Sequence, residues 1–382
     1  RIRQLGPAYL TFHSAESSRF THSLGVFHLA RRAFERMLPL APELETYRGL
    51  LYGAALLHDI GHGPLSHTGE EMFGLHHEAW SARVIRHHPE IHDCLESHAS
   101  GTAEAVANLL EHGRSPHPLI KHLVSSQLDC DRLDYLLRDS YSTGTRYGQL
   151  DLDRILGALT LAPDGDMAIH PKGLMAVEHY LVVRNLMYRS VYNHRLNVVC
   201  NWLLEKLILT ARQLGPDQVW ADEVMATWLW QPDQIRLEDF LANDDQRTGY
   251  HLQRWQAEAP AALAELSGRF LDRRLLKATA VEHLSPADQL QLLATARRLA
   301  DRHGHDPELC CGLRHQQLRG YHPYRGGLRL WDGQQLQALE KASPLVESLA
   351  TPAATSWLIH PRDISNELRQ EMDVEWPRAA AA

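Results

Sequence analysis

Residues 54–64 read AALLHDIGHGP and set two potential metal ligands, His58 and Asp59, next to each other after an apolar run. The apolar residues predict a helix over residues 43–59, which the following glycines and proline would end. An unpartnered His-Asp pair buried there would be costly, which indicates a metal ion or another strong partner. The alternative is that Asp59 caps the helix and hydrogen-bonds to His58. Two further segments favour the metal.

The first of these segments is a helix predicted over residues 17–38, with Ser17 or Ser18 as its N-cap. Arg19 and His22 are three residues apart in this segment. Side chains at that spacing share one face of a helix, so the guanidinium and the imidazole would point the same way.

The second segment is a helix predicted over residues 117–139. A carboxylate, a phenol and a carboxylate repeat on one side of it, at Asp131, Tyr135 and Asp139. Asp134 and Arg138 form a separate pair four residues apart, which is expected to be a surface ion pair.

The rest of the chain predicts further helices, one hairpin and a few short strands. Gly215-Pro216 marks a change of character, so we expect a helical domain over residues 1–214 and a smaller α+β lobe over residues 215–382. The expected elements are helices at 77–88, 102–112, 173–213 and 334–349, a hairpin at 158–170 that turns at Pro163-Asp164-Gly165, and strands at 326–331 and around 357–360.

Composition excludes several classes of protein. Lys and Arg total 39 and Asp and Glu total 47, which gives a net charge of −8 and makes a dedicated nucleic-acid coat a poor candidate. The five cysteines form no C-x-x-C pair, so a disulfide framework is not expected and a reducing cytoplasm is the simplest setting. No apolar stretch is long enough to predict a membrane span. The chain does not begin with Met, which predicts a missing N-terminal segment.

These motifs together resemble a known family. His22, His58-Asp59 and Asp131 have the order and context of the HD-domain metal phosphohydrolases, which implies a mainly α, HD-domain helical bundle. Longer strings resemble the deoxynucleoside triphosphate (dNTP) triphosphohydrolases, above all the branch with the animal SAM-and-HD-domain enzyme and its bacterial relatives. The likeness covers about residues 1–200, and its strings are RQLG at 3–6, RFTHSLGV at 19–26, HDIGHGPLSH at 58–67 and DCDRLDY at 129–135.

The resemblance implies a metal site and a catalytic group beside it. The implied ligands of one divalent transition ion, iron, manganese, zinc or nickel, are His22, His58, Asp59 and Asp131. Two imidazoles and two carboxylates suit such an ion. The resemblance also implies that His62, His67 and His77 lie on the phosphate side. Their near-neutral titration suits proton transfer at physiological pH. Glu70 would orient His67, although many relatives have Asp at this position. Mg²⁺ would accompany the polyphosphate.

The resemblance also implies a nucleotide pocket. Its implied triphosphate ligands are Arg19, Arg132 and Arg184, although the family often has Lys where Arg132 stands. The implied sugar contacts are Gln4, Tyr135 and Asp139, with Leu5 packed beneath the ring and Tyr192 crowding the 2′ carbon. The segment RNLMYRSVYNH at 184–194 matches the nucleotide-facing helix except at Tyr188, where His is frequent. Without the resemblance, Tyr188 and Tyr192 are simply a helix-packing pair.

The implied function is hydrolysis of dNTPs to deoxynucleoside and inorganic triphosphate. The first alternative is an HD phosphohydrolase for nucleoside monophosphates or for cyclic or alarmone nucleotides. The second is a nucleotide sensor without turnover, and the third is a single-strand nuclease. The resemblance also allows a nucleotide activator and implies a homo-oligomer, either a dimer or a tetramer. Neither a membrane nor a nucleic acid is expected as a partner.

Overall fold

The computed structural model describes residues 1–318, 320–323 and 327–375. Internal contacts divide the chain into two compact units. Unit 1 consists of Arg1–Tyr192, Glu223–Thr248 and Arg319–Thr351, and unit 2 of Asn193–Asp222, Gly249–Leu318 and Pro352–Ala382. The two units interleave along the sequence, whereas the expected division between residues 214 and 215 is sequential. Two segments that follow residue 215 therefore belong to the same unit as the HD motif.

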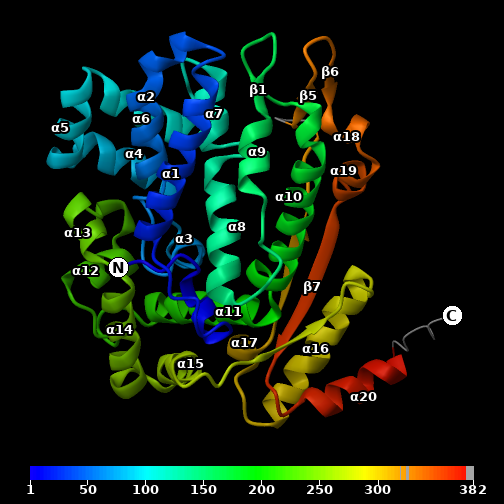
Figure 1. Cartoon of the computed structure of the whole chain (residues 1–382). Helices are drawn as coiled ribbons and strands as arrows, with labels where there is room; N and C mark the ends of the chain where they lie inside the picture. Colours follow the sequence, from blue (N-terminus) through cyan, green and yellow to red (C-terminus); the bar gives the residue numbers. More distant parts are fainter. Residues whose placement is uncertain (319, 324–326, 376–382) are drawn as a thin grey trace. The chain divides into compact units, whose positions relative to one another are not determined.

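Unit 1 is a helical bundle. Its central helices are α1 (Arg19–Met37), α2 (Arg48–Leu57), α8 (Cys130–Thr143) and α10 (Leu174–Met187). Figure 1 shows α8 with α1 on one side and α10 on the other. The first helix begins as the sequence predicts, because the Ser18 hydroxyl accepts a hydrogen bond from the Thr21 backbone N–H. The apolar side of α1, with Phe34 fully buried, packs into the main core.

Shorter helices surround this centre, and those expected at 77–88 and 102–112 are confirmed. They are α3 (His67–Phe73), α4 (His77–His87), α5 (Pro89–His98), α6 (Thr102–His112), α7 (Pro118–Val124), α9 (Leu152–Ala158), α12 (Glu223–Trp230), α13 (Leu237–Ala242), α18 (Leu339–Ala342) and α19 (Pro344–Leu349). Single 3₁₀ turns cover Gly6–Leu10, Pro42–Tyr47, Pro171–Gly173 and Pro232–Gln234. The helix expected at 43–59 therefore begins as a 3₁₀ turn and ends before His58.

Two long helices expected from the sequence are interrupted. The segment 117–139 forms α7 and α8 instead of one helix, because the Asp129 carboxylate accepts backbone N–H bonds from Ser126 and from Arg132 and so caps α8. The segment 173–213 forms α10, a π-helical turn at Tyr188–Tyr192, and α11 (Arg195–Leu214) in unit 2. Such π turns are frequent at functional sites.

A small sheet joins distant parts of unit 1. The expected hairpin is confirmed as β1 (Leu159–Leu161) and β2 (Met167–Ile169). Strand β5 (Arg329–Trp331) pairs in parallel with β2, and β6 (Leu336–Ala338) pairs with β5. The helix expected at 334–349 is therefore wrong over its first residues, where Gly333, at φ +99°, allows the chain to turn back into β6.

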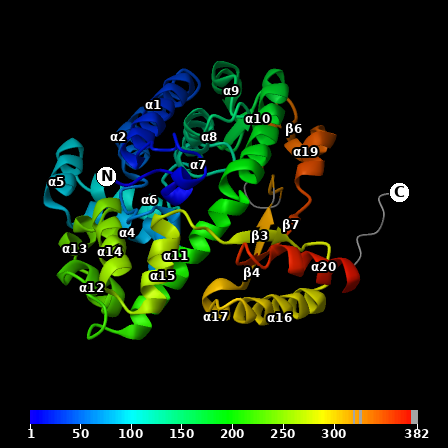
Figure 2. The same ribbon diagram turned by 90° about the horizontal axis from the view of Figure 1, so that it is seen from below.

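Unit 2 is the α+β part of the fold. Its strands are β3 (Lys277–Ala280), β4 (Gly312–Leu318) and β7 (Ala353–His360), in the antiparallel order β3-β7-β4, which confirms the strand expected around 357–360. Its other helices are α15 (Ala261–Leu271), α16 (Pro286–Arg302), α17 (Pro307–Cys310) and α20 (Ser365–Glu375), and α14 (Asp245–Glu258) begins in unit 1 and ends in unit 2. Helices α16 and α20 lie side by side (Figure 2). Among the described residues, no helix has the length and apolar character needed to cross a bilayer.

Candidate functional site

The HD motif meets α1 and α8 in the interior of unit 1. His22 comes from α1, His58 and Asp59 follow the end of α2, and Asp131 lies in the first turn of α8. The His22 Nε2 atom is 3.0 Å from Asp131 Oδ1 and 3.4 Å from Asp59 Oδ2. The His58 Nε2 atom is 3.4 Å from Asp59 Oδ2 and 3.7 Å from Asp131 Oδ1. Two imidazole nitrogens and two carboxylates from three separate segments therefore converge on one point.

The opposite nitrogen of each imidazole is fixed by the protein. His22 Nδ1 donates to Asp134 Oδ2 at 2.8 Å, and His58 Nδ1 donates to the Ala55 carbonyl at 3.0 Å. These bonds select the tautomer that leaves the Nε2 lone pair facing the carboxylates, as is usual for metal-bound histidines. Asp134 is 7% exposed and is also bridged by Arg138, so the expected surface ion pair is wrong. Asp134 lies behind His22 in the buried interior.

The four residues fit a divalent transition ion. Within the described residues, the buried Nε2 atoms of His22 and His58 have no hydrogen-bond partner of acceptable geometry. Burial opposes a positive charge on His58, yet Asp59 and Asp131 raise the pKa of its imidazole well above the usual value. This pocket therefore has strong negative potential at its centre. A cation with nitrogen and oxygen preference would satisfy both the lone pairs and the carboxylates.

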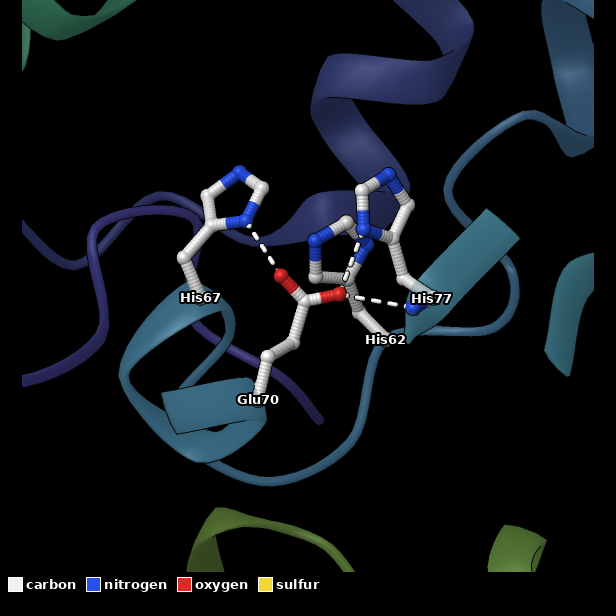
Figure 3. A group of neighbouring side chains, drawn as sticks. All are labelled: His62, His67, Glu70 and His77. Atoms are coloured by element: carbon white, nitrogen blue, oxygen red, sulfur yellow. Dashed lines mark hydrogen bonds and ion pairs between the residues drawn. The ribbon is translucent and has the colours of Figure 1, made fainter. Parts of the chain in front are cut away.

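A second cluster lies next to the first and contains three histidines around one carboxylate (Figure 3). Glu70 accepts from His67 Nδ1 at 2.8 Å through one oxygen, and from His77 Nδ1 at 2.5 Å through the other. The second oxygen also accepts from the His77 backbone N–H at 2.7 Å. The His62 ring stacks on the His77 ring at 4.1 Å. Glu70 thus fixes both His67 and His77, whereas the sequence predicts a bond to His67 alone.

The electrostatic environment shifts the pKa values of His62 and His77 in opposite directions. Burial lowers the pKa of His62 well below its usual value, and the nearby Arg19 cation lowers it further. His62 therefore stays neutral, which differs from the expected near-neutral titration. Burial also opposes charge on His77, but the Glu70 carboxylate outweighs it and raises the pKa of His77. The pKa of Glu70 is lowered despite burial, because both imidazoles donate to it.

The loop between the two clusters has an uncommon backbone. Leu65 and Ser66 are consecutive non-glycine residues with φ of +62° and +61°. Such conformations cost about 1–3 kcal/mol each and persist only where the surroundings impose them. They turn the chain so that α3 starts at His67. Gly6, at φ +50°, lies so close that an added Cβ would be 2.4 Å from the Leu65 carbonyl oxygen.

The three arginines expected to bind triphosphate have different partners. Arg19 is buried, donates to the Ser66 hydroxyl and pairs with Asp59. Arg132 pairs with Asp129 at the start of its own helix. Arg184 is 6% exposed and lies 5.7 Å from the Tyr188 ring centre, and within the described residues its Nε and Nη1 atoms have no hydrogen-bond partner. A buried guanidinium with unpartnered N–H groups is costly, and an anion such as phosphate would remove that cost.

One cavity of about 490 Å³ holds most of the expected site residues. They are Gln4, Leu5, Arg19, His58, Asp59, His67, His77, Asp131, Arg132, Tyr135, Asp139, Tyr188 and Tyr192. His22, His62, Glu70 and Arg184 are not among the lining residues. The lining also includes residues that sequence reasoning missed, namely Glu78, Leu109, Leu110, Gly113, Val124 and Ser125. A volume of this size suits a ligand as large as a nucleotide.

Part of the cavity lining is rich in hydroxyl and carboxyl groups. Tyr192 donates to Asp139 Oδ2 at 2.9 Å, and the Tyr135 and Tyr188 hydroxyls are 3.2 Å apart. Burial raises the pKa of Asp139 to about 7. The other oxygen of Asp139 and the Gln4 Oε1 atom are buried and have no hydrogen-bond partner within the described residues. These acceptors could take hydroxyl groups of a ligand.

Comparisons with known proteins agree with this arrangement. The HD domain model matches residues 19–139 and the HD associated region matches residues 150–360. The uncharacterized protein YwfO of Bacillus subtilis is 33% identical over 95% of this chain and 86% of its own length. A crystal structure of a phosphohydrolase from Bacteroides thetaiotaomicron superposes with a TM-score of 0.82 at 26% identity, over 95% of this chain and 92% of that one.

More distant relatives have named activities. A deoxynucleoside triphosphate triphosphohydrolase SAMHD1 homolog of Dictyostelium discoideum is 29% identical over 56% of this chain. The match spans 44% of that protein's own length, so less than half of it corresponds to this chain. With two family models over most of its length and a relative similar from end to end, this chain belongs to the HD-domain family of metal-dependent phosphohydrolases.

Proposed function

We propose that the protein hydrolyses dNTPs to deoxynucleoside and inorganic triphosphate. The observation that carries the proposal is the buried guanidinium of Arg184, whose Nε and Nη1 atoms have no hydrogen-bond partner within the described residues. It lies beside Tyr188, which lines a nucleotide-sized cavity together with His58, Asp59 and Asp131. A phosphate chain matches both the charge and the fork of this side chain. The likeness to dNTP triphosphohydrolases supports a substrate with three phosphates.

His22, His58, Asp59 and Asp131 would hold one divalent transition ion. When bound, such an ion polarises a phosphate oxygen and lowers the pKa of a bound water. Arg19 would fix the α-phosphate region from its place between Ser66 and Asp59, while Arg132 and Arg184 would hold the outer phosphates. His77 lines the cavity, and the Glu70 carboxylate raises its pKa against the effect of burial, which favours a positive imidazole there. Mg²⁺ would arrive with the polyphosphate.

At the sugar end, Gln4 and Asp139 offer unsatisfied acceptors that would take the 3′ hydroxyl. Tyr192 is held by Asp139 at 2.9 Å, which fixes its ring against the wall. Leu5 and the Tyr192 ring would then close the space beside the 2′ carbon. The proposed preference for deoxyribose rests on this closure.

A product assay tests the proposal. The metal-loaded protein is incubated with each dNTP and each NTP, with and without a second nucleotide as activator, and the products are resolved. Release of intact triphosphate supports the proposal. Release of pyrophosphate or of single phosphate would contradict the proposal. Cleavage of monophosphate, cyclic or alarmone nucleotides alone would point to the first alternative function, and binding without turnover to the second.

The first prediction concerns sugar selectivity. Tyr192→Ala should relax the preference for dGTP over GTP, because the aromatic ring no longer fills the space beside C2′. Rejection of an added hydroxyl by shape alone reaches only about a hundredfold, so the parent protein should still hydrolyse GTP slowly. Tyr192→Phe is the matched control, since it keeps the ring and removes only the bond to Asp139. Equal kcat/KM for GTP and dGTP in the parent would contradict the assignment.

The second prediction concerns Arg184. Arg184→Met should lower dNTP affinity about tenfold to a hundredfold, because hydrogen bonds to charged groups contribute about 1.5–3 kcal/mol. The same change should leave Tm unchanged or raise it, because an apolar side chain replaces an unpaired buried charge. The affinity for dNTP is measured by calorimetry under conditions in which the nucleotide is not hydrolysed. The Tm is measured by thermal denaturation. A large fall in Tm with unchanged affinity would assign Arg184 to the core.

A further inference from the structure

We infer that Asp245 is a positioning residue for the reaction proposed above, and that it fastens the two loops on which the cavity depends. Asp245 is 7% exposed and belongs to unit 1. Its Oδ1 atom accepts the Leu65 backbone N–H at 2.7 Å, and its Oδ2 atom accepts the Arg3 backbone N–H at 2.9 Å. One carboxylate therefore bridges two segments that are 62 positions apart in the sequence.

Both bridged segments lead directly into the cavity. Arg3 precedes Gln4 and Leu5, and Leu65 precedes Ser66 and His67. Gln4, Leu5 and His67 line the cavity, while the Ser66 hydroxyl accepts from Arg19 and donates to the Gln4 carbonyl at 3.2 Å. In the part of the chain that the structure describes, Asp245 has no hydrogen bond or ion pair to these side chains. It acts on their neighbours, through the two backbone bonds and through an ion pair with the Arg3 guanidinium at 3.6 Å.

The loop that Asp245 holds is the strained one. Leu65 and Ser66 adopt φ of +62° and +61°, a conformation that a free chain of these residues rarely takes. The Leu65 N–H bond to Asp245 fixes one side of this residue, and the close approach of Gly6 to its carbonyl oxygen confines the other. If the acceptor is lost, the buried N–H is unsatisfied and the loop can relax. His67 would then leave its position.

The neighbouring residue offers a matched control. The Asp244 Oδ1 atom accepts the Gln246 backbone N–H at 3.0 Å and the Arg247 backbone N–H at 2.9 Å, so it caps α14. Its Oδ2 atom pairs with the exposed Arg1 guanidinium at 3.1 Å, and an exposed ion pair of this kind contributes little. Its removal should lower Tm, as loss of a helix cap does, without changing the loop. Asp245→Asn is the test variant, because an amide has one acceptor oxygen and can keep only one of the two bonds.

Asp245→Asn should lower kcat for dNTP hydrolysis about tenfold to a hundredfold, since small misplacements of catalytic groups have effects of this size. Its metal content should equal that of the parent, because Asp245 bonds to Leu65 and Arg3 and to none of the four proposed metal ligands. Asp244→Ala should keep the parental kcat per bound metal and lose only thermal stability. If Asp245→Asn does not fold, Asp245→Glu replaces it. The longer side chain displaces both carboxylate oxygens, so the same changes in kcat and metal content are expected.

A second measurement does not depend on turnover. Hydrogen–deuterium exchange of the peptide covering residues 63–67 should become faster in Asp245→Asn and stay parental in Asp244→Ala. Parental exchange there, or parental kcat with full metal content, would overturn the inference. If the parent hydrolyses no dNTP, the proposed function fails, and the exchange result alone decides whether Asp245 holds the loop.

Discussion

Asp131→Ala is expected to remove most of the bound metal and, with it, turnover. The Asp131 carboxylate faces both imidazoles, at 3.0 Å from His22 Nε2 and 3.7 Å from His58 Nε2. We propose Asp131 as the metal ligand that α8 supplies, as the resemblance implies. Loss of a hydrogen-bond partner behind a ligand costs about 10–100-fold in metal affinity, and loss of the ligand itself should exceed that. Metal analysis of the purified variant gives the occupancy.

Asp134→Asn is the matched control for this change. It keeps all four proposed ligands and weakens only the bond behind His22, so it should retain metal at high concentration and lose it on dilution. Chelation should lower the Tm of the parent, because an ion at a hundredfold excess over its Kd adds about 2.7 kcal/mol to folding. Chelation should leave the Tm of Asp131→Ala unchanged. Full occupancy in both Asp131→Ala and His58→Ala would exclude the site as proposed.

Short-range patterns in the sequence predict much of this site. The apolar run before His58 and the cap at Ser18 are signals of this kind, and the structure has α1 and the HD motif where those signals predict them. Asp131, Tyr135 and Asp139 share one helix, so their common side follows from spacing alone. The approach of the three segments to one another depends on long-range contacts, and only the family resemblance implies that they share one ion.

What the sequence could not predict depends on contacts between distant segments. Asp134 reads as one half of an exposed pair with Arg138, and only its packing behind His22 shows it to be buried. Strand β6 reads as a helix start, although its partner β5 lies just before it in the chain. The hairpin of β5 and β6 forms against β2, and that pairing with a distant segment is what the sequence does not show. Residues 243–245 read Asn-Asp-Asp, a run typical of a helix cap. Nothing in the neighbouring sequence shows that Asp245, and not Asn243 or Asp244, bonds to the distant Leu65.

The His67→Ala variant should lose turnover by about a hundredfold to ten-thousandfold while it keeps its metal, because general acid catalysis contributes that much. The departing 5′ oxygen is a poor leaving group as an alkoxide and requires a proton at the moment of cleavage. His67 lines the cavity, and its Nδ1 atom is held by Glu70 at 2.8 Å. This bond turns the other nitrogen away from Glu70 and leaves it available to the substrate. Affinity for dNTP should stay near the parental value.

Glu70→Gln tests how much turnover depends on the orientation of His67, because it keeps the His67 imidazole and changes only the group that holds it. The amide can still accept one imidazole bond, so the loss of turnover should be milder than in His67→Ala. Glu70 raises the pKa of His77 against the effect of burial, so its neutralisation should lower that pKa. Activity that depends on a charged His77 persists below its pKa and is lost above it. The basic limb of the pH–rate profile should therefore move to lower pH in Glu70→Gln.

A metal-loaded His67→Ala protein that retains about a third or more of parental turnover would place the acid elsewhere, since a true general acid contributes far more. The structure then leaves one choice within this cluster. His62 is buried and its pKa is lowered well below the usual value, so near neutral pH it is a neutral imidazole rather than the imidazolium that a general acid requires. His77 lines the same cavity with a raised pKa, and His77→Ala would be the next variant to measure.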